Sequence, residues 1–244
     1  MIHDPTRTKM LRQQYSKQLI KLYRNFGRNI IPVLIDYVQN RQHKKSIRQL
    51  HGTPFDDWLD FQITDHITNP SENVIQRNIK LAYQRGKQGA RNKLIPIEIA
   101  ENMTPLDWMA LDEIEYINYN RIVDCTNSMK NAIKYSCSRG IMEGWGAQKI
   151  AYELRNNVTG NQNMGITRAR MIARTEVINA YNTAARKTYE QAGLTEKQMI
   201  WITSFDERTC PVCSGYDEKP LSEIGEYPPI HPNCRCSIIP KPEK

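Results

Sequence analysis

The sequence predicts a mainly α-helical protein, in which an elongated helical body precedes a small α+β C-terminal module with a zinc-knuckle-like Cys/His loop. Three observations support this prediction. Apolar residues recur at helical spacing over most of the chain before residue 200. Only 39% of the 244 residues are hydrophobic and the mean hydropathy is −0.65, values that indicate much solvated helix surface. Four of the six cysteines fall between residues 210 and 236.

The composition and the breaks in the pattern suggest two domains. We expect a helical body over residues 1–155, with an extended, basic N-terminal part, and a C-terminal module over residues 156–244, because 156–165 is a polar loop. The net charge of +8 favours a polyanionic neighbour such as nucleic acid about as strongly as a solvated surface. The polar start predicts no signal peptide, and no apolar run suits a membrane span, so free thiols in a cytoplasm are expected.

The first predicted helix begins near Thr6, and Pro32 either kinks or restarts it. Its basic face either touches phosphate or keeps the helix solvated, and the second interpretation is favoured. The apolar stripe comprises Leu11, Tyr15, Leu19, Leu22, Phe26 and Ile30, and the opposite face carries Arg12, Lys17, Lys21, Arg24 and Arg28. The densest positive run follows this helix, and its candidate phosphate contacts are Arg41, Lys44, Lys45 and Arg48.

Two further helices are predicted before residue 100. One starts at 55–58, and another spans 71–94, where Gly86 and Gly89 either weaken the helix or mark a close helix contact. A long helix then starts at Thr104, with Pro105 at its first position and Asp107 near the positive end of its dipole. Its apolar stripe runs to about residue 139, requires one phase shift between 114 and 122, and includes Trp108. Cys125 and Cys137 lie on this stripe as buried apolar side chains.

The C-terminal third combines helices with a strand. A short helix is expected from 147 to 154, and a strong one from 166 to 192, with alanines on one face and Gly193 as its cap. Small residues on one face predict that another element packs closely against it. Residues 198–203 are enriched in β-branched and aromatic side chains and predict a strand.

The Cys/His segment predicts a metal site. Cys210 and Cys213 have the spacing of a tetrahedral zinc knuckle, and His231, Cys234 and Cys236 bring the donors to five for four positions. The expected ligands are Cys210, Cys213, His231 and either Cys234 or Cys236, because residues at i and i+2 of an extended segment face the same side. The spare cysteine would be a solvent-accessible thiol. A closed set of four ligands indicates structural zinc, which is favoured over buried thiols or disulfides.

Two catalytic interpretations were weighed against a structural one. Zinc deaminases require an upstream His-x-Glu, which this sequence lacks. A nuclease of the His-Asn-His type would use His66, but this residue lies far upstream of the cysteines and fits a surface or capping role. No catalytic residue is therefore predicted and the chain is expected not to be an enzyme; the alternatives are a zinc-dependent nuclease or deaminase and a free-standing DNA-binding module.

Three motifs together closely resemble the phage Mu F-like minor head proteins, also called head morphogenesis proteins, of tailed bacteriophages. They are Ala173-Arg174-Thr175-Glu176; Trp201 with Asp206-Glu207-Arg208-Thr209-Cys210; and His231-Pro232-Asn233-Cys234-Arg235-Cys236, within a resemblance that covers roughly residues 147–240. The resemblance implies a minor capsid protein at the portal vertex that acts in head assembly, DNA packaging or DNA ejection. It also implies several copies per virion, a host cytoplasm during assembly, and portal protein, major capsid protein and packaged double-stranded DNA as partners.

The same motifs suggest a structural network beside the metal. A guanidinium at Arg174 can bind loop carbonyls or Asp206 in a bidentate manner, and Glu176 can pair with Arg208 or Arg235. Thr175 and Trp201 belong to the same signature. The alternative is an exposed helix face that contributes little to stability.

Overall fold

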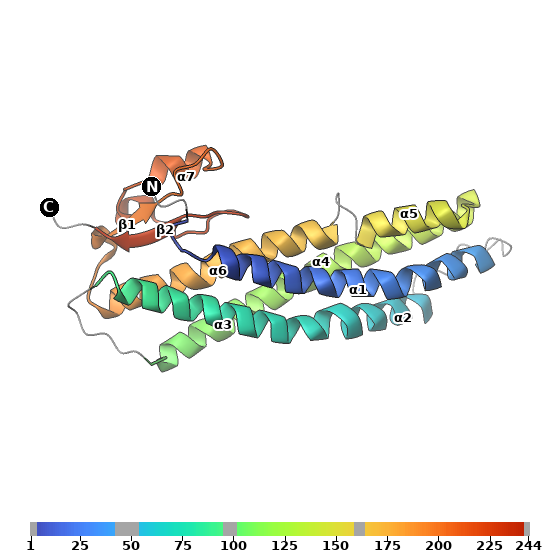
Figure 1. Cartoon of the computed structure of the whole chain (residues 1–244), viewed down its shortest axis with the longest axis horizontal. Coiled ribbons are helices and arrows are strands. Elements are labelled where there is room, and N and C mark those ends of the chain that lie inside the picture. The colour runs from blue at the N-terminus through green and yellow to red at the C-terminus, as the bar shows by residue number, and fades with distance from the viewer. Residues whose placement is uncertain (1–3, 42–53, 95–101, 159–163, 242–244) are drawn as a thin grey trace. The chain divides into compact units, whose positions relative to one another are not determined.

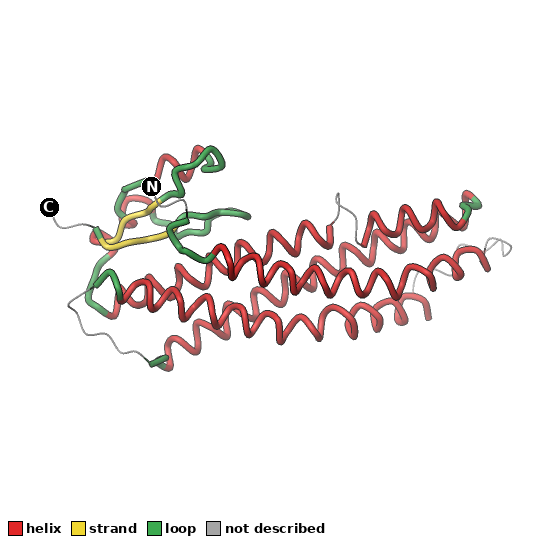
Figure 2. Tube along the Cα trace, in the orientation of Figure 1, coloured by secondary structure: helices red, strands yellow, loops and turns green. Residues whose placement is uncertain are grey.

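The computed structural model describes residues 4–41, 54–94, 102–158 and 164–241 (Figure 1). It confirms a mainly helical chain with one small antiparallel sheet near the C-terminus (Figure 2). The chain forms two compact units, whose boundaries fall within long helices. Unit 1 comprises Met1–Tyr15, Ile75–Asn118 and Met171–Lys244, and unit 2 comprises Ser16–Val74 and Tyr119–Arg170. The division into domains at residues 155 and 156 stays a prediction.

The described elements follow one another closely along the chain. The helices are α1 (Lys9–Arg41), α2 (Pro54–Ile63), α3 (Asn69–Arg91), α4 (Pro105–Glu143), α5 (Ala147–Val158), α6 (Met164–Gln191), α7 (Pro211–Tyr216) and α8 (Leu221–Ile224). A π-helical turn, η2 (Thr64–Thr68), joins α2 to α3, and a 3₁₀ turn, η3 (Glu196–Gln198), precedes the strands β1 (Met199–Ile202) and β2 (Ser237–Pro240). Among the described helices, none combines the length and the apolar character that a membrane span requires.

The first helix excludes one of the two interpretations of Pro32 and differs from its prediction at one position of the buried stripe. It continues through Pro32 without a restart, because its buried residues hold both halves against neighbouring helices. Tyr23 is buried in the stripe where Leu22 was expected. The predicted phosphate contacts Lys44, Lys45 and Arg48 and the side chain of Arg41 lie outside the described residues.

Helix α4 needs no phase shift, because Asn118 completes its buried stripe between Ile114 and Ile122. The Asn118 amide donates hydrogen bonds to the Ile114 carbonyl (3.1 Å) and to Glu176 Oε2 of α6 (3.2 Å), and its oxygen accepts one from the Tyr15 hydroxyl (3.3 Å). A buried polar residue with these partners interrupts the apolar pattern without interrupting the packing. Cys125 and Cys137 are buried as predicted, whereas Trp108 is 44% exposed.

Helix boundaries near the polar segment also differ from the sequence prediction. Residues 156–158 belong to the end of α5 and residues 164–165 to the start of α6, so the loop of 156–165 was predicted too long. The backbone of these residues is helical although their polar side chains show no apolar periodicity, which is why the sequence pattern did not predict these helix ends. The helix predicted over 71–94 is α3, and it begins and ends slightly earlier.

A buried ion pair joins α3 to the start of α4. Lys87 Nζ lies 2.7 Å from Asp107 Oδ2, and both side chains are almost completely buried. The ammonium also donates to the Asn102 carbonyl (2.8 Å), while the carboxylate accepts hydrogen bonds from Tyr83 and Thr104, each 2.8 Å long. Asp107 therefore caps α4, as its sequence position indicated, and at the same time neutralises a buried cation.

Helices α3 and α6 approach each other closely in unit 1. A Cβ atom on Gly86 would lie 2.2 Å from the Tyr181 carbonyl oxygen and 2.9 Å from Ala184 Cβ, and one on Gly89 would lie 2.5 Å from the Tyr181 hydroxyl. The two glycines therefore mark a close helix contact, one of the two interpretations that the sequence allowed. The alanine-rich face of α6 is the surface on which this contact depends.

Replacing Gly86 with alanine should destabilise the chain by about 1–3 kcal/mol, because the new methyl group meets backbone that has no room to move. Helix propensity alone would favour alanine by about 1 kcal/mol, so the sign of the change tests the contact. Urea unfolding followed by circular dichroism measures it. Gly215→Ala in α7 is the matched control, since nothing lies within 4 Å of its added Cβ; equal stability of the two variants would contradict the close packing.

The small sheet closes the C-terminal part of the chain. Strand β1, predicted over 198–203, pairs with β2 in antiparallel register from Met199 opposite Pro240 to Ile202 opposite Ser237. Strand β2 was not predicted. The hydrophobic cluster beneath the sheet includes Trp201, three of the cysteines and residues of α3, α6, α7, α8 and β2; its buried members are Ala90, Leu94, Tyr181, Ala185, Tyr189, Met199, Trp201, Cys213, Leu221, Cys234, Cys236 and Ile238.

Candidate metal centre

The first two cysteines are placed by the short helix that follows β1. Cys210 is the N-cap of α7 and Pro211 is its first residue, where a missing N–H costs nothing. The Cys213 N–H donates to Cys210 Sγ over 3.4 Å. This turn directs both sulfur atoms to the same side, as a knuckle of two metal ligands requires.

The other three donors lie on the loop that leads into β2, and α6 fixes this loop at two points. The Asn233 N–H donates to Thr175 Oγ1 (3.0 Å), at a residue whose φ of 63° is left-handed. Asn182 donates to the Cys236 carbonyl (2.9 Å) and accepts from the Ser237 hydroxyl (3.0 Å). The loop is therefore held against α6 by hydrogen bonds that do not depend on a metal.

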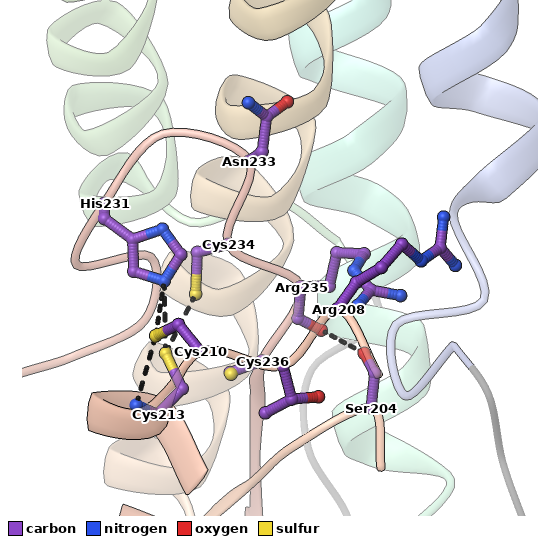
Figure 3. Close-up of a pocket in the computed structure, with 10 residues that line it drawn as sticks. Ser204, Arg208, Cys210, Cys213, His231, Asn233, Cys234, Arg235 and Cys236 are labelled. Atoms are coloured by element: carbon purple, nitrogen blue, oxygen red, sulfur yellow. Dashed lines mark hydrogen bonds between the residues drawn. The ribbon is translucent and has the colours of Figure 1, made fainter. Parts of the chain in front are cut away.

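The five predicted ligands form two groups of three that share Cys213 (Figure 3): Cys210, Cys213 and His231, and Cys213, Cys234 and Cys236, with the ligand atoms of each group within 4.8 Å of one another. His231 Nε2 lies 3.4 Å from Cys210 Sγ and 3.2 Å from Cys213 Sγ, and Cys213 Sγ lies 3.9 Å from Cys234 Sγ. Zinc–ligand bonds of about 2.3 Å to sulfur and about 2.0 Å to nitrogen imply edges of about 3.8 Å between sulfurs and about 3.5 Å between sulfur and nitrogen. The three distances named above are close to these edges, whereas Cys210, Cys213, His231 and Cys234 do not all lie within 4.8 Å of one another.

The imidazole of His231 is oriented by its own backbone. Nδ1 lies 2.9 Å from the Pro232 carbonyl oxygen, so a proton on Nδ1 donates there and leaves the lone pair of Nε2 directed at the sulfurs. A backbone partner for the second ring nitrogen is typical of metal-binding histidines. This arrangement favours Nε2 as the ligand atom.

Cys234 and Cys236 differ in their surroundings, although both are buried, at 2% and 3% exposure. A hydrogen bond from the Cys236 thiol, opposed by burial, lowers the pKa of Cys234 to about 6. The same hydrogen bond, together with burial, raises the pKa of Cys236 far above its usual range. The expectation that the spare thiol is solvent-accessible is wrong, because β2 and the hydrophobic cluster cover both residues.

Asp206 has other partners than the sequence suggested. Arg235 binds its carboxylate with two guanidinium nitrogens, and Arg208 adds a backbone hydrogen bond (3.0 Å) and a side-chain one (3.1 Å). The hydrogen bonds from Arg235 are the main reason that the pKa of Asp206 lies well below its usual range; burial opposes them and Arg208 assists. The ion pair therefore ties the loop before Cys210 to the loop that carries Cys234 and Cys236.

The three signature residues on α6 point in different directions, since successive residues of a helix are about 100° apart. Thr175 faces the metal-ligand loop and holds Asn233. Glu176 is 0% exposed and accepts the hydrogen bond from Asn118, and Arg174 is exposed. The expected pairing of Glu176 with Arg208 or Arg235, and of Arg174 with loop carbonyls or Asp206, stays a prediction. Trp201 lies fully buried in the hydrophobic cluster, with its ring edge against Tyr216.

Two asparagines of this region were missed in the sequence. Asn182 follows Thr175 by seven residues, which is two helical turns, so the two share a face opposite the alanines; Asn118 sits where the apolar stripe of α4 skips one position. For Asn118 the signal was an amide within an apolar stripe, because a buried amide requires partners. For Asn182 the signal was its spacing of two turns from Thr175.

His66 takes no part in the metal centre. It lies in η2, within unit 2, and its nearest carboxylate is the neighbouring Asp65, with Nδ1 3.6 Å from Oδ2. The Cys/His cluster, comprising Cys210, Cys213, His231, Cys234 and Cys236, lies within unit 1. It consists of four cysteines and one histidine in two groups of three that share Cys213.

Together these elements define a mainly helical protein with a small C-terminal module that carries a Cys/His cluster. Residues 131–239 match the family model described as Phage Mu protein F like protein, which confirms the resemblance and extends it sixteen residues toward the N-terminus. The matched region covers less than half of the 244-residue chain, so it is this C-terminal part that is similar to the family. No match to the chain was found among curated proteins or among solved structures.

Proposed function

We propose that the chain is a minor capsid protein of a tailed bacteriophage, located at the portal vertex, where several copies act in head assembly, DNA packaging or DNA ejection. The match over residues 131–239 carries this proposal, because it includes both α6 and the loop that α6 holds through Thr175. Portal protein and major capsid protein are the proposed partners. The proposed setting is the virion, after assembly in the host cytoplasm.

We further propose that a structural zinc ion stabilises this module. Its ligands are Cys210, Cys213, His231 and Cys234, because the distances from His231 to Cys210 and Cys213 and from Cys213 to Cys234 resemble edges of a zinc tetrahedron. The four donor atoms do not all lie within 4.8 Å of one another, so binding of the ion would draw them closer together. Cys236 is then a neighbour whose thiol donates to Cys234. Four protein ligands leave no open position for substrate, which supports a structural role.

Heads of the phage that encodes the chain test the virion role directly. Mass spectrometry of purified heads should detect several copies of the chain, and cross-linking should join it to the portal protein. Heads assembled without the chain should lose infectivity. Absence of the chain from both precursor and mature heads would overturn the proposal.

The alternative of a zinc-dependent nuclease or deaminase requires a separate assay. Purified chain is incubated with single- and double-stranded DNA in the presence of zinc, magnesium or manganese. We expect no turnover. Turnover that disappears in both Cys210→Ser and His66→Ala would establish the enzyme instead.

A further inference from the structure

The exposed face of α1 within unit 2 carries four cations at helical spacing, Lys17, Lys21, Arg24 and Arg28. All four side chains are exposed, and none makes an ion pair with a residue that the structure describes. We infer that these residues, the basic face, bind the phosphate backbone of duplex DNA. The inference rests on the proposed function for the presence of DNA in the same particle, but its contacts and its test do not involve the metal centre.

The charge pattern of α1 differs from that of a merely solvated helix. Solvated helices usually alternate charges, so that opposite signs meet at i and i+4, as Arg139 and Glu143 do in α4. The chain has no Asp or Glu from residue 5 to residue 35, and the basic face places like charges four residues apart. Like charges at this spacing oppose helix formation unless a polyanion neutralises them. The buried stripe of α1 offsets that repulsion and keeps the cations aligned.

The net charge of the chain is concentrated in the unit that carries the basic face. Unit 2 contains 16 Lys and Arg residues against 9 Asp and Glu residues, a net charge of +7, whereas unit 1 contains 18 against 17, a net charge of +1. The total of +8 is therefore not spread evenly over the surface. A local positive field of this kind attracts and orients a polyanion over distances of about one Debye length.

The chemistry of the face fits a duplex better than a single strand. Lys17 and Arg28 are eleven residues apart, about 16 Å along the helix, which is long enough for the four cations to reach successive phosphates. Asn25 and Asn29 are exposed beside them and can also donate to phosphate oxygens. The described part of this face presents no exposed aromatic side chain, which stacking on single-stranded bases would require. Binding should therefore depend on the backbone and not on the base sequence.

Fluorescence anisotropy with the purified full chain and two short duplexes of unrelated sequence tests the inference. Both duplexes should bind with similar affinity. If four phosphates are neutralised, the association constant should fall roughly 150-fold between about 50 and 200 mM salt. A flat salt response, or tighter binding to single-stranded DNA or to vesicles of anionic lipid than to duplex, would overturn it.

Neutralising the basic face should remove most of the binding and flatten the salt dependence. A control that removes the same charge from exposed cations of unit 1 should retain the affinity within a few-fold, and circular dichroism should show both variants folded. Equal loss in the two variants would mean that net charge alone drives binding, and the assignment would fail. The test variant combines Lys17→Gln, Lys21→Gln, Arg24→Gln and Arg28→Gln, and the control combines Arg77→Gln, Arg85→Gln, Lys197→Gln and Lys219→Gln.

This experiment is independent of the one on heads. If the chain is present in heads but its basic face binds no duplex, the proposed function stands and the DNA-binding surface is refuted. If the chain binds duplex through the basic face but is absent from heads, the DNA-binding surface stands and the proposed function is refuted.

Discussion

Removing the metal with a chelator, or replacing Cys213 with serine, should lower the free energy of unfolding of unit 1 by several kcal/mol. Structural zinc contributes about 10–16 kcal/mol of apparent binding free energy in small peptides that do not fold without it. The expected loss is smaller here, because the sheet, α6 and the hydrophobic cluster provide a core that does not depend on metal. Thermal unfolding with and without chelator measures the loss, and a fall of Tm by about 2–4 °C per kcal/mol is expected for this chain length.

Metal content identifies the ligands. The purified chain should contain about one zinc ion under reducing conditions, and a content well below one would remove the metal from the proposal. Cys213→Ser and Cys234→Ser should lose zinc, whereas Cys236→Ser should retain it. Cys137→Ala is the matched control, because this cysteine is buried in α4 and lies outside the cluster. Zinc loss in Cys236→Ser but not in Cys234→Ser would mean that Cys236, and not Cys234, is the fourth ligand.

The second large effect is expected at the buried ion pair of α3 and α4. Asp107→Asn should destabilise the chain by about 3–5 kcal/mol, because it leaves the Lys87 ammonium buried without a counter-charge. Glu143→Gln, which breaks an exposed pair with Arg139, should cost less than about 1 kcal/mol. The double variant Lys87→Met with Asp107→Asn should recover part of the loss, since no charge then remains buried. A double variant no more stable than Asp107→Asn would show that the ion pair is not the cause.

The same carboxylate predicts a pH dependence. Burial raises the pKa of Asp107, but the hydrogen bonds from Lys87, Thr104 and Tyr83 outweigh it and lower the pKa to about 2. A depressed pKa stabilises the fold above the unfolded value of about 4 and loses this contribution as the pH falls toward 2. The wild-type chain should therefore lose about 2 kcal/mol more than Asp107→Asn between these values in urea titrations. Parallel acid limbs of the two curves would contradict the assignment.

Periodicity predicted the helices well, because each long helix buries one continuous stripe. It misjudged the positions where a buried polar group replaces an apolar one. Asn118 looked like a shift in phase, and its partners Tyr15 and Glu176 come from helices far away in sequence. Strand β2 escaped prediction because four residues with a terminal proline acquire strand geometry only through pairing with β1.

The candidate metal centre was predictable as a set of residue types but not as an arrangement. Spacing identified all five donors, whereas the separate surroundings of Cys234 and Cys236 depend on how β2 enters the sheet. The partner of Asp206 could not be read from spacing either. Arg235 reaches it because the two loops lie side by side, which a linear sequence does not show.

Thr175 and Asn182 are separated by two turns of α6 and bind the two ends of the segment 233–237. The spacing of Thr175 and Asn182 along the helix therefore fixes the distance between the two ends of the segment. Inserting one residue between them would rotate Asn182 by about 100° away from the face that Thr175 occupies. With such an insertion only one of the two ends of the segment could stay attached to α6, and the cysteines between them would be displaced.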